Sequence, residues 1–518
     1  AARKRGAKSV VAREVIRIIT PGTITEDALL ESRQHNYLAA LADAGGDLGL
    51  AWLELSTGEF NVQPVTATAL AAALARLDPG EFLVGERLLQ NTDLFGVFAQ
   101  WKQVITPAPP GARDSEAARR RLAEIYKVQV LDGFGDFSRP EIAACGALVD
   151  YVELTQKGRL PLLAPPRRMT GASTLEIDAA TRRNLEITRT LSGTREGSLL
   201  AVIDRTVTGA GGRLIAARLA APLTDPAAIS ERAGGVAYFV DDGGVREDVR
   251  TALGRCPDVE RALSRITLER GTPRDLAAIG DGLHQAALLR ARLEGDGAAL
   301  PAALAAAVQG LGFHAELVER LSRALAPEPP PTARDGGFIA AGYSAPLDEL
   351  RLLRDESRRL IANLQQRYAE DTGVATLKIR HNNVIGYFIE VTPTHADKVA
   401  VGEDGPFIHR QTLASAVRFT TVELGELETR IGRAADRALA LELELFADLA
   451  GELVARAEGI AAAARALAEL DVAAALAQLA VERRYVRPVV DDSTAFDIVG
   501  GRHPVVEAAL EGANQAAF

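Results

Sequence analysis

Apolar residues recur at alternating intervals of three and four along two long stretches, residues 346–368 and 422–454. This is the period of a helix that packs on a partner along one seam. The pattern therefore predicts two long helical arms. The predicted stripes are Leu350, Leu353, Leu360, Ile361, Leu364 and Tyr368 in the first arm, and Leu424, Leu427, Ile431, Ala438, Leu445, Leu449 and Leu453 in the second.

Between the two arms the hydrophobic period changes to two, at residues 376–380 and again at 387–392. Alternation of this kind predicts strands. Residues 381–383, His-Asn-Asn, are the expected turn because Asn tolerates positive φ. We therefore expect residues 376–418 to form a small sheet carried at the tip of two helical arms.

The first part of the chain alternates strand and helix patterns. Short strands are expected at residues 10–11 and 15–19, before a break at Pro21-Gly22. The pattern then predicts an α/β unit that extends to about residue 158. Its expected strands are 37–42, 48–55, 59–65 and 81–85, with a hairpin turn at 56–58, and its expected helices are 67–77 and 115–126.

Residues 161–166 form a proline-rich linker, and most of the chain after it has the periodicity of helices. The expected helices are 181–191, 212–219, 226–240, 245–253, 259–268, 273–293, 302–325 and 461–481. After Pro488 the pattern predicts a strand at 496–499, followed by Gly-Gly-Arg-His-Pro at 500–504. The fold class is therefore multidomain and mainly α.

Length and composition narrow the possible classes of protein. A chain of 518 residues is long enough for roughly three or four domains. Its net charge of −10 excludes a generally basic nucleic-acid binder, so such contacts must come from local patches. Cys145 and Cys256 are far apart and form no CxxC pair, which is typical of a reducing cytoplasm. No apolar run is long enough to cross a bilayer, and the N-terminal residues do not resemble a signal peptide.

Charge suggests two candidate sites. The insert between the arms is slightly basic, and cations with Asn and Thr on a projecting sheet suit DNA phosphates. A solvated β tip on a coiled coil explains the same residues, and on charge alone it is the commoner case. In the α/β unit, Asp43, Asp47, Glu54 and Glu59 could be metal ligands on a nuclease-like sheet, but scattered surface carboxylates are far commoner. We therefore expect no metal site and no catalytic residues.

Four stretches resemble the MutS family of DNA mismatch-recognition ATPases, in family order and over essentially the whole chain. Each stretch alone is modest, and the four together carry the resemblance. They are residues 23–30 with 36–38, residues 175–178 with 181, 184–187 and 198–200, residues 377–379 with 386–391 and 410–413, and residues 501–507.

The resemblance implies a ribonuclease-H-like α/β connector, an all-α core with long lever helices, a small β clamp between the levers and the start of an ABC-type ATPase domain. The expected boundaries are 1–20 for a linker, 21–160 for the connector, 167–368 with 422–485 for the core and levers, 369–421 for the clamp and 486–518 for the ATPase start.

The resemblance also implies particular site residues. The clamp would contact the DNA backbone through Arg380, Asn382, Arg410, Thr412, Ser415 and Arg418, whereas Ala414 stands where relatives carry a lysine. Phe518 matches an aromatic residue that stacks on adenine, although it fits equally well as a core residue. No GxxxxGK followed by Ser or Thr occurs, and Phe388-Ile389-Glu390 fits the family's Phe-x-Glu mismatch wedge only by coincidence.

We therefore expect a piece of a longer, bacterial, cytoplasmic and nucleoid-associated mismatch repair protein. The whole protein would be a weak DNA-dependent ATPase that uses ATP and Mg²⁺, whereas this chain would bind no cofactor and be inactive alone. Expected partners are mismatched or looped double-stranded DNA, a second copy in a homodimer and a MutL-type repair protein, with no membrane. The alternatives are a MutS paralogue that acts in recombination and a structural coiled-coil protein.

Overall fold

The computed structural model describes residues 15–109, 114–170, 173–295, 299–382, 385–399, 401 and 405–512. The chain divides into two compact units, residues 1–319 with 452–518 and residues 320–451. Each unit is described by itself. In the described part of the chain, no helix is both long and apolar enough to cross a membrane.

The first unit contains a mixed six-stranded sheet in the order β5-β4-β1-β2-β3-β6. Two hairpins make β1, β2 and β3 antiparallel, while β1–β4, β4–β5 and β3–β6 pair in parallel. The strands are β1 Leu38–Ala44, β2 Asp47–Glu54, β3 Glu59–Val65, β4 Glu81–Val84, β5 Ile105–Pro107 and β6 Arg167–Arg168.

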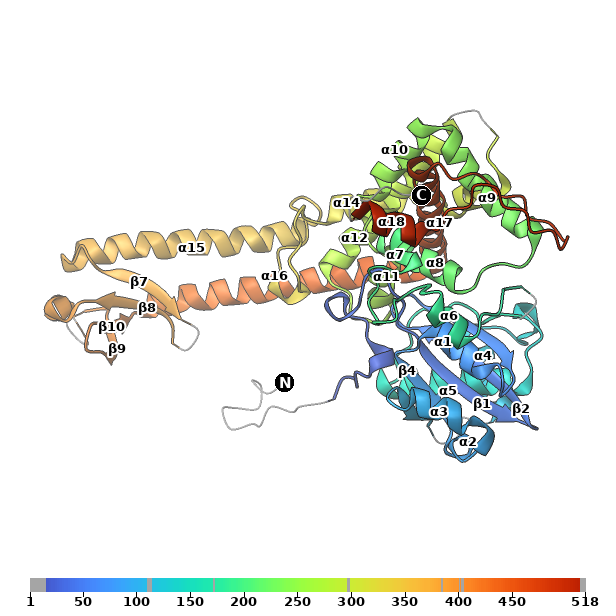
Figure 1. Ribbon diagram of the computed structural model, residues 1–518. Coiled ribbons are helices and arrows are strands. Elements are labelled where there is room, and N and C mark those ends of the chain that lie inside the picture. The colour runs from blue at the N-terminus through green and yellow to red at the C-terminus, as the bar shows by residue number, and fades with distance from the viewer. Residues whose placement is uncertain are drawn as a thin grey trace. The chain divides into compact units, whose positions relative to one another are not determined.

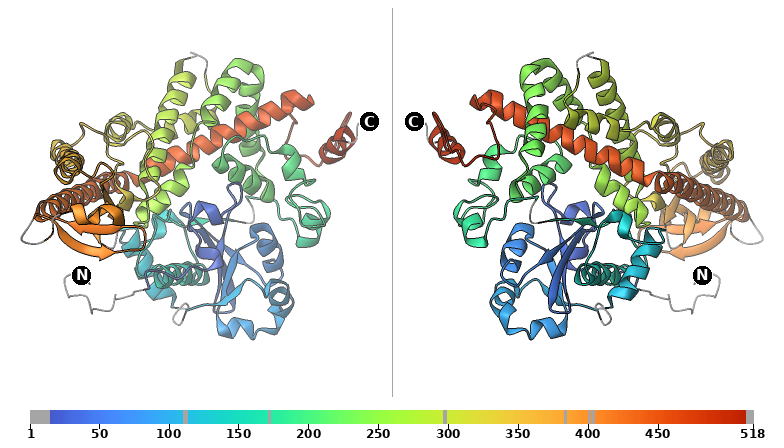
Figure 2. Two further views of the ribbon diagram at one scale, coloured as in Figure 1. Left: turned by 90° about the vertical axis from the view of Figure 1, so that its left-hand side faces the viewer. Right: turned by 90° about the vertical axis from the view of Figure 1, so that its right-hand side faces the viewer.

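Helices cover both faces of this sheet, so its central strands are buried on both sides (Figure 2). Leu38 and Ala40 face Leu148 on α5, and the alternate residues Ala39 and Leu41 face α1 and α3. Short 3-10 turns lie before β1 and between the later elements around this sheet. The elements are η2 Pro21–Thr23, η3 Asp27–Leu29, α1 Leu70–Leu77, α2 Glu86–Leu89, η4 Thr92–Leu94, α3 Phe95–Trp101, α4 Ser115–Ile125, η5 Asp132–Phe134 and α5 Arg139–Thr155.

A long central helix, α17, organises the helical part of the first unit and packs against α8, α9, α10 and α13. Its buried Asp471 accepts hydrogen bonds from the Val207 and Thr208 amides and from the Thr208 hydroxyl, at 2.6–3.2 Å. The helices outside the arms are α6 Ala179–Asn184, α7 Leu199–Ile203, α8 Gly209–Ala220, α9 Pro226–Asp241, α10 Gly243–Leu253, α11 Val259–Thr267, α12 Pro273–Gly295, α13 Ala302–Gly310, α14 Ala315–Ala324, α17 Ala457–Arg483 and α18 Pro504–Gly512.

In the second unit two long helices run side by side and carry a small antiparallel sheet at one end (Figure 1). The sheet has the order β7-β8-β10-β9, and its apolar face packs between the helices on Tyr368 and Leu427. The elements are η6 Ala333–Asp335, α15 Ala345–Thr372, β7 Lys378–Asn382, β8 Gly386–Val391, η7 Pro393–Lys398, β9 Ile408–Thr412, β10 Val417–Thr420 and α16 Val422–Ala455.

A buried carboxylate joins α15 to α16 away from the sheet. Glu442 accepts hydrogen bonds from the Gly337 amide at 2.5 Å and from the Arg351 guanidinium at 2.8 Å. The predicted stripe on α16 is mostly buried, whereas Leu353 and Leu360 of α15 are more than 40% exposed. Two helices alone cover only a narrow seam, so part of the α15 stripe stays in contact with solvent.

Several predicted elements were wrong. Residues 15–19 form no strand, and residues 10–11 lie outside the described part of the chain. The helix expected at 181–191 ends at Asn184, since Glu186 adopts a positive φ of 47°. The helix expected at 302–325 is split into α13 and α14, and Gly312 between them has φ +66°.

Two further predictions failed, one because the expected strand pairing is missing and one because strand pairing extends further than expected. Residues 496–499 are exposed and form no strand, because an extended segment needs a neighbouring strand for its hydrogen bonds. The turn expected at 381–383 is displaced, since His381 and Asn382 are still paired within β7, opposite Tyr387 and Gly386. Asn383 lies outside the described residues.

Gly386 provides a stability test of the small sheet. It has φ +74°, and a Cβ there would lie 1.9 Å from the Glu428 carboxylate. Glu428 can move aside, so the backbone conformation decides the cost, and we expect Gly386→Ala to lower the free energy of unfolding by about 1–2 kcal/mol. Chemical denaturation should detect this loss.

A matched control is Gly432→Ala in the exposed interior of α16, where a Cβ would meet nothing within 4 Å. This substitution should raise stability by about 0.5–1 kcal/mol, because Ala favours the helix. Equal denaturation midpoints for the two variants would contradict the assigned backbone conformation of Gly386.

Candidate nucleic-acid interface and a buried ion network

The predicted cations of the small sheet meet on one face. Strand pairing places Lys378 and Arg418 on either side of Glu390, and Arg380 beside Phe388 on the same strand face. The Glu390 carboxylate holds Arg380 at 3.3 Å through one oxygen and Arg418 at 3.2 Å through the other. The structure therefore brings two of the predicted phosphate contacts together around one acidic residue.

Arg418 is the more constrained of these two cations. Its guanidinium also donates to the Gln411 side chain at 3.2 Å and lies over the Phe388 ring, 4.4 Å from the ring centroid. Stacking on an aromatic face leaves the other edges of a guanidinium available for an oxyanion. Together these contacts hold the positively charged Arg418 guanidinium in one orientation on this face of the sheet.

Arg410 occupies an irregular position on the edge strand β9. The pairing register skips it, so that Arg410 and Gln411 together lie opposite Arg418, as in a β-bulge. A bulge re-aims a side chain and is common at sheet edges. Arg410 is exposed, and no ion pair is recorded for it among the described residues.

The remaining predicted contacts are polar and more dispersed. The Thr412 hydroxyl lies 2.9 Å from His409 Nε2 at the end of β9, and Ser415 is exposed in the turn before β10. Asn382 accepts a hydrogen bond from the Ile385 amide at 2.8 Å, so it stabilises the β7–β8 turn. Phe518, the predicted adenine contact, lies outside the described residues.

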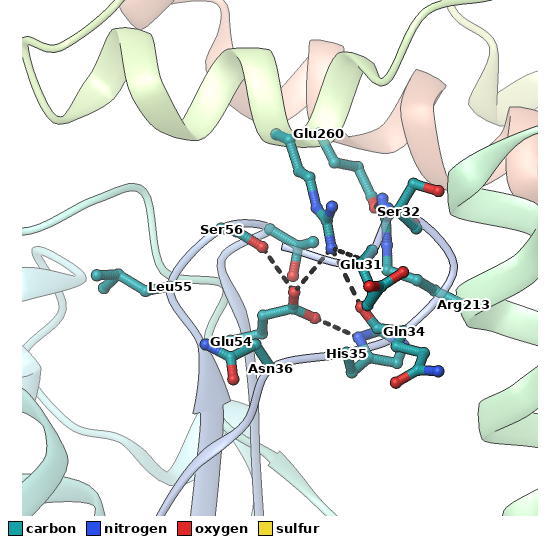
Figure 3. Close-up of polar contacts among 12 residues, drawn as sticks. Glu31, Ser32, Gln34, His35, Asn36, Glu54, Leu55, Ser56, Arg213 and Glu260 are labelled. Carbon is teal, nitrogen blue, oxygen red and sulfur yellow. Dashed lines mark hydrogen bonds and ion pairs between the residues drawn. The ribbon is translucent and has the colours of Figure 1, made fainter. Parts of the chain in front are cut away.

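A second polar constellation lies in the first unit, where the ends of the mixed sheet meet the core helices (Figure 3). Glu54, the last residue of β2, is completely buried. Its carboxylate binds His35 Nδ1 and accepts a hydrogen bond from the Ser56 hydroxyl at 2.6 Å. Tyr37 stacks on His35 and donates to Glu59 at 3.3 Å.

Two arginines from the core helices complete this network. Arg213 of α8 is only 1% exposed and donates to Asp258 and Glu260 at 2.7–3.1 Å and to the Ser32 carbonyl at 2.8 Å. Arg261 of α11 donates to the Glu31 and Gln34 carbonyls and lies 3.7 Å from Glu54. These contacts fix the segment before β1 against the helices.

The network shifts the pKa values of its ionisable groups. Burial alone would lower the pKa of His35, but the charge and hydrogen bond of Glu54, helped by Glu59, outweigh burial and Arg213 and raise it. Burial would raise the pKa of Glu54, but His35, Arg213 and Ser56 together lower it to about 2. Both shifts favour an ion pair of protonated His35 with ionised Glu54.

Of the four carboxylates considered as metal ligands, only Glu54 and Glu59 come together, and His35 joins them with ligand atoms within 4.8 Å. Glu54 is not a surface carboxylate, but its oxygens already serve His35 and Ser56. Asp43 and Asp47 belong to the distant β1–β2 turn. Sequence reasoning missed His35 because nothing in the chain links it to a partner nineteen positions later.

Comparison with known proteins is consistent with this architecture. The family model described as MutS domain III matches residues 180–477, and the model for MutS domain II matches residues 36–164. The first model alone covers more than half of the chain. The chain belongs to the MutS family.

Similar relatives are DNA mismatch repair proteins MutS from several bacteria. The chain is 53% identical over 516 residues to that of Paracoccus denitrificans strain Pd 1222, a match that covers 99% of this chain and 58% of the relative. It is 53% identical over 510 residues to the protein of Dinoroseobacter shibae, covering 98% and 58% of the two chains. The chain thus spans somewhat more than half the length of these relatives.

The His35–Glu54 pair predicts a pH dependence of stability. The folded pKa of His35 is raised, so its stabilising effect is fully present below the ordinary value of 6.5 and is lost as pH rises through the folded pKa. We expect His35→Gln to cost more stability at pH 5.5 than at pH 9, while Glu54 stays ionised throughout this range. Chemical denaturation at both pH values measures the difference.

His395→Gln is the control, because His395 has no ion pair with the described residues. This variant measures, at each pH, the effect of replacing a histidine that has no paired carboxylate among the described residues. A cost for His35→Gln that grows with pH would show that the folded state prefers neutral histidine at this position.

Proposed function

We propose that this chain is the connector, core and DNA-clamp portion of a protein that recognises mismatched duplex DNA and couples ATP to repair signalling. The observation that carries the proposal is the match, over nearly the whole chain, to relatives named DNA mismatch repair protein MutS. The four sequence stretches that resemble the MutS family also follow one another in the family's order. A paralogue that acts in recombination is the second candidate, and the domain II match over 36–164 argues against forms that lack the connector.

The sheet of the first unit supports the proposed ribonuclease-H-like connector. Its strands lie in the order β3-β2-β1-β4-β5. Strand β2 pairs antiparallel with both β1 and β3, whereas β4 pairs in parallel with β1 and β5, and this is the arrangement expected of that fold. We assign the connector to residues 21–160, after a linker at 1–20. Residues 167–368 with 422–485 form the core and levers, 369–421 the clamp and 486–518 the start of the ATPase domain.

The clamp proposal rests on the charged face of the small sheet. Arg380, Arg410 and Arg418 would bind phosphates, with Asn382, Thr412 and Ser415 as weaker polar contacts, and none of them is positioned to distinguish bases. Glu390 keeps Arg380 and Arg418 oriented before DNA binds. The paired helices α15 and α16, roughly 42 and 51 Å long at 1.5 Å per residue, would act as levers that hold this clamp.

The nucleotide-dependent steps are assigned to the parent protein. ATP and Mg²⁺ would be its cofactors, and Phe518 would stack on adenine. A homodimer, double-stranded DNA and a MutL-type protein that contacts the connector and core would be its partners, in the bacterial cytoplasm around the nucleoid. A purely structural coiled-coil role is disfavoured by the arginine cluster around Glu390.

The chain should bind duplex DNA weakly, with strong salt dependence and equal affinity for matched and mismatched duplexes. Each phosphate contact contributes about 0.9 to the slope of log affinity against log salt concentration. We expect Arg410→Gln to lower this slope by about one, since Arg410 makes no ion pair with the residues that the structure describes. Fluorescence anisotropy over a salt series measures the slope.

Three further variants sharpen this test. Arg433→Gln, an exposed arginine on α16, removes the same charge from the arm and should leave the slope nearly unchanged. Glu390→Gln should raise DNA affinity, because it frees Arg380 and Arg418 from their carboxylate. If a variant in which Arg380, Arg410 and Arg418 are all replaced by Gln binds duplex DNA with the same affinity and salt slope as the parent chain, the clamp assignment is refuted.

The purified chain should hydrolyse no ATP above the buffer background. It contains no GxxxxGK loop followed by Ser or Thr, so no backbone cradle or lysine of that kind exists for the nucleotide phosphates. A coupled assay of phosphate release, with and without duplex DNA, checks this expectation. Turnover that disappears after a single substitution within the chain would disprove it.

A further inference from the structure

A cavity of about 360 Å³ lies within the first unit, between the mixed sheet and the core helices. Trp52 of β2 and Arg76 of α1 line it from the sheet side, and Arg182 of α6 and Arg218 of α8 line it from the helical side. Its volume is within the range of small-molecule pockets. Neither the predicted DNA contacts nor the expected nucleotide contact belong to it.

The lining of the cavity is strongly cationic. Seven arginines line it against only three acidic residues. Arg218 is paired with Glu469, Arg195 with Asp204, and Arg189 lies 3.7 Å from Asp78. In the described part of the chain, four of the seven have no carboxylate within ion-pair distance, namely Arg76, Arg167, Arg182 and Arg232.

Arg182 is the most informative of these four. Its side chain is 7% exposed, and its Nη2 donates to the Ala220 carbonyl at 2.8 Å. Its Nε and Nη1 atoms are buried without a hydrogen-bond partner among the described residues. Leaving the donors of a buried charged group unsatisfied is unfavourable, so this arrangement favours an additional acceptor beside Arg182.

The positive charges of neighbouring arginines further favour a negatively charged ligand beside Arg182. Burial, and then the like charge of Arg76, lower the pKa of Arg182, and burial lowers the pKa of Arg76. Burial also lowers the pKa of Arg232, with repulsion from Arg218 and Arg167 adding to it. Arg76 is held over the Trp52 ring at 5.2 Å and donates to Gln63 at 2.5 Å, so its position is set by the fold.

We propose that this cavity binds a small phosphate-bearing anion, with Arg182, Arg76 and Arg232 as its principal ligands. Guanidinium groups match phosphate oxygens with paired hydrogen bonds, and several of them converge here on a space too small for a protein segment or a duplex. A bound anion would satisfy Arg182 and would join the sheet to the helices, because its ligands come from both. The same chemistry is offered by free inorganic phosphates and by the phosphates of a mononucleotide.

The test measures binding to the purified chain by isothermal titration calorimetry and by thermal unfolding. The probes are sodium pyrophosphate, ADP and adenosine, with sodium chloride at matched ionic strength as the control for screening. We expect pyrophosphate or ADP to bind and to raise the unfolding temperature, since a ligand of the native state stabilises it. Tighter binding of pyrophosphate assigns a free phosphate, and tighter binding of ADP assigns a nucleotide.

Variants locate the binding. Arg182→Gln should weaken the preferred probe at least tenfold, and Arg232→Gln, which changes a partly exposed side chain and so disturbs folding less, should weaken it several-fold. Arg119→Gln on α4, outside the cavity, should bind like the parent chain. The proposal is overturned if neither phosphate probe binds more tightly than chloride or adenosine, or if folded Arg232→Gln and Arg76→Lys variants both retain full affinity.

Discussion

Compensation of buried charge is the constraint on which the first unit depends. Glu54, Arg213 and Arg261 are almost completely excluded from solvent, and removing an ion from water costs several kcal/mol unless a partner is present. Each of these groups finds its partner on a different element, so the end of β2, the segment before β1 and helices α8 and α11 must meet in one arrangement. Apolar packing alone would allow the sheet to slide against the helices.

In the second unit the compensation of buried charge has a smaller part. Glu442 links the two arms at one point through Gly337 and Arg351, and the apolar seam provides most of the remaining contact. At the sheet, Glu390 holds Arg380, which is 55% exposed, and Arg418, which is 20% exposed. An exposed ion pair is worth little, so under the proposed clamp function a phosphate group would replace the carboxylate most easily beside Arg380, the more exposed of the two arginines.

Long periodic segments were predictable because their pattern reflects burial along one face. Both arms and helices α9 to α12 were located within a few residues. Helix α5 was not identified, since it is buried nearly all round and so carries little amphipathic period. The strand predicted at 496–499 failed for the opposite reason, because an alternating pattern cannot supply the neighbouring strand that its backbone requires.

The sequence by itself determined the helical arms, the β insert between them, the family resemblance and the arginines at 380 and 418 as candidate contacts. Only the tertiary structure decided that Glu390 joins those arginines, that Arg410 lies at a break in strand register, and that His35 pairs with Glu54. It also brought Arg76 and Arg182 to one cavity from helices a hundred residues apart. Periodicity reports which face of an element is buried, whereas electrostatic partners are set by how distant elements pack, and no local pattern encodes that.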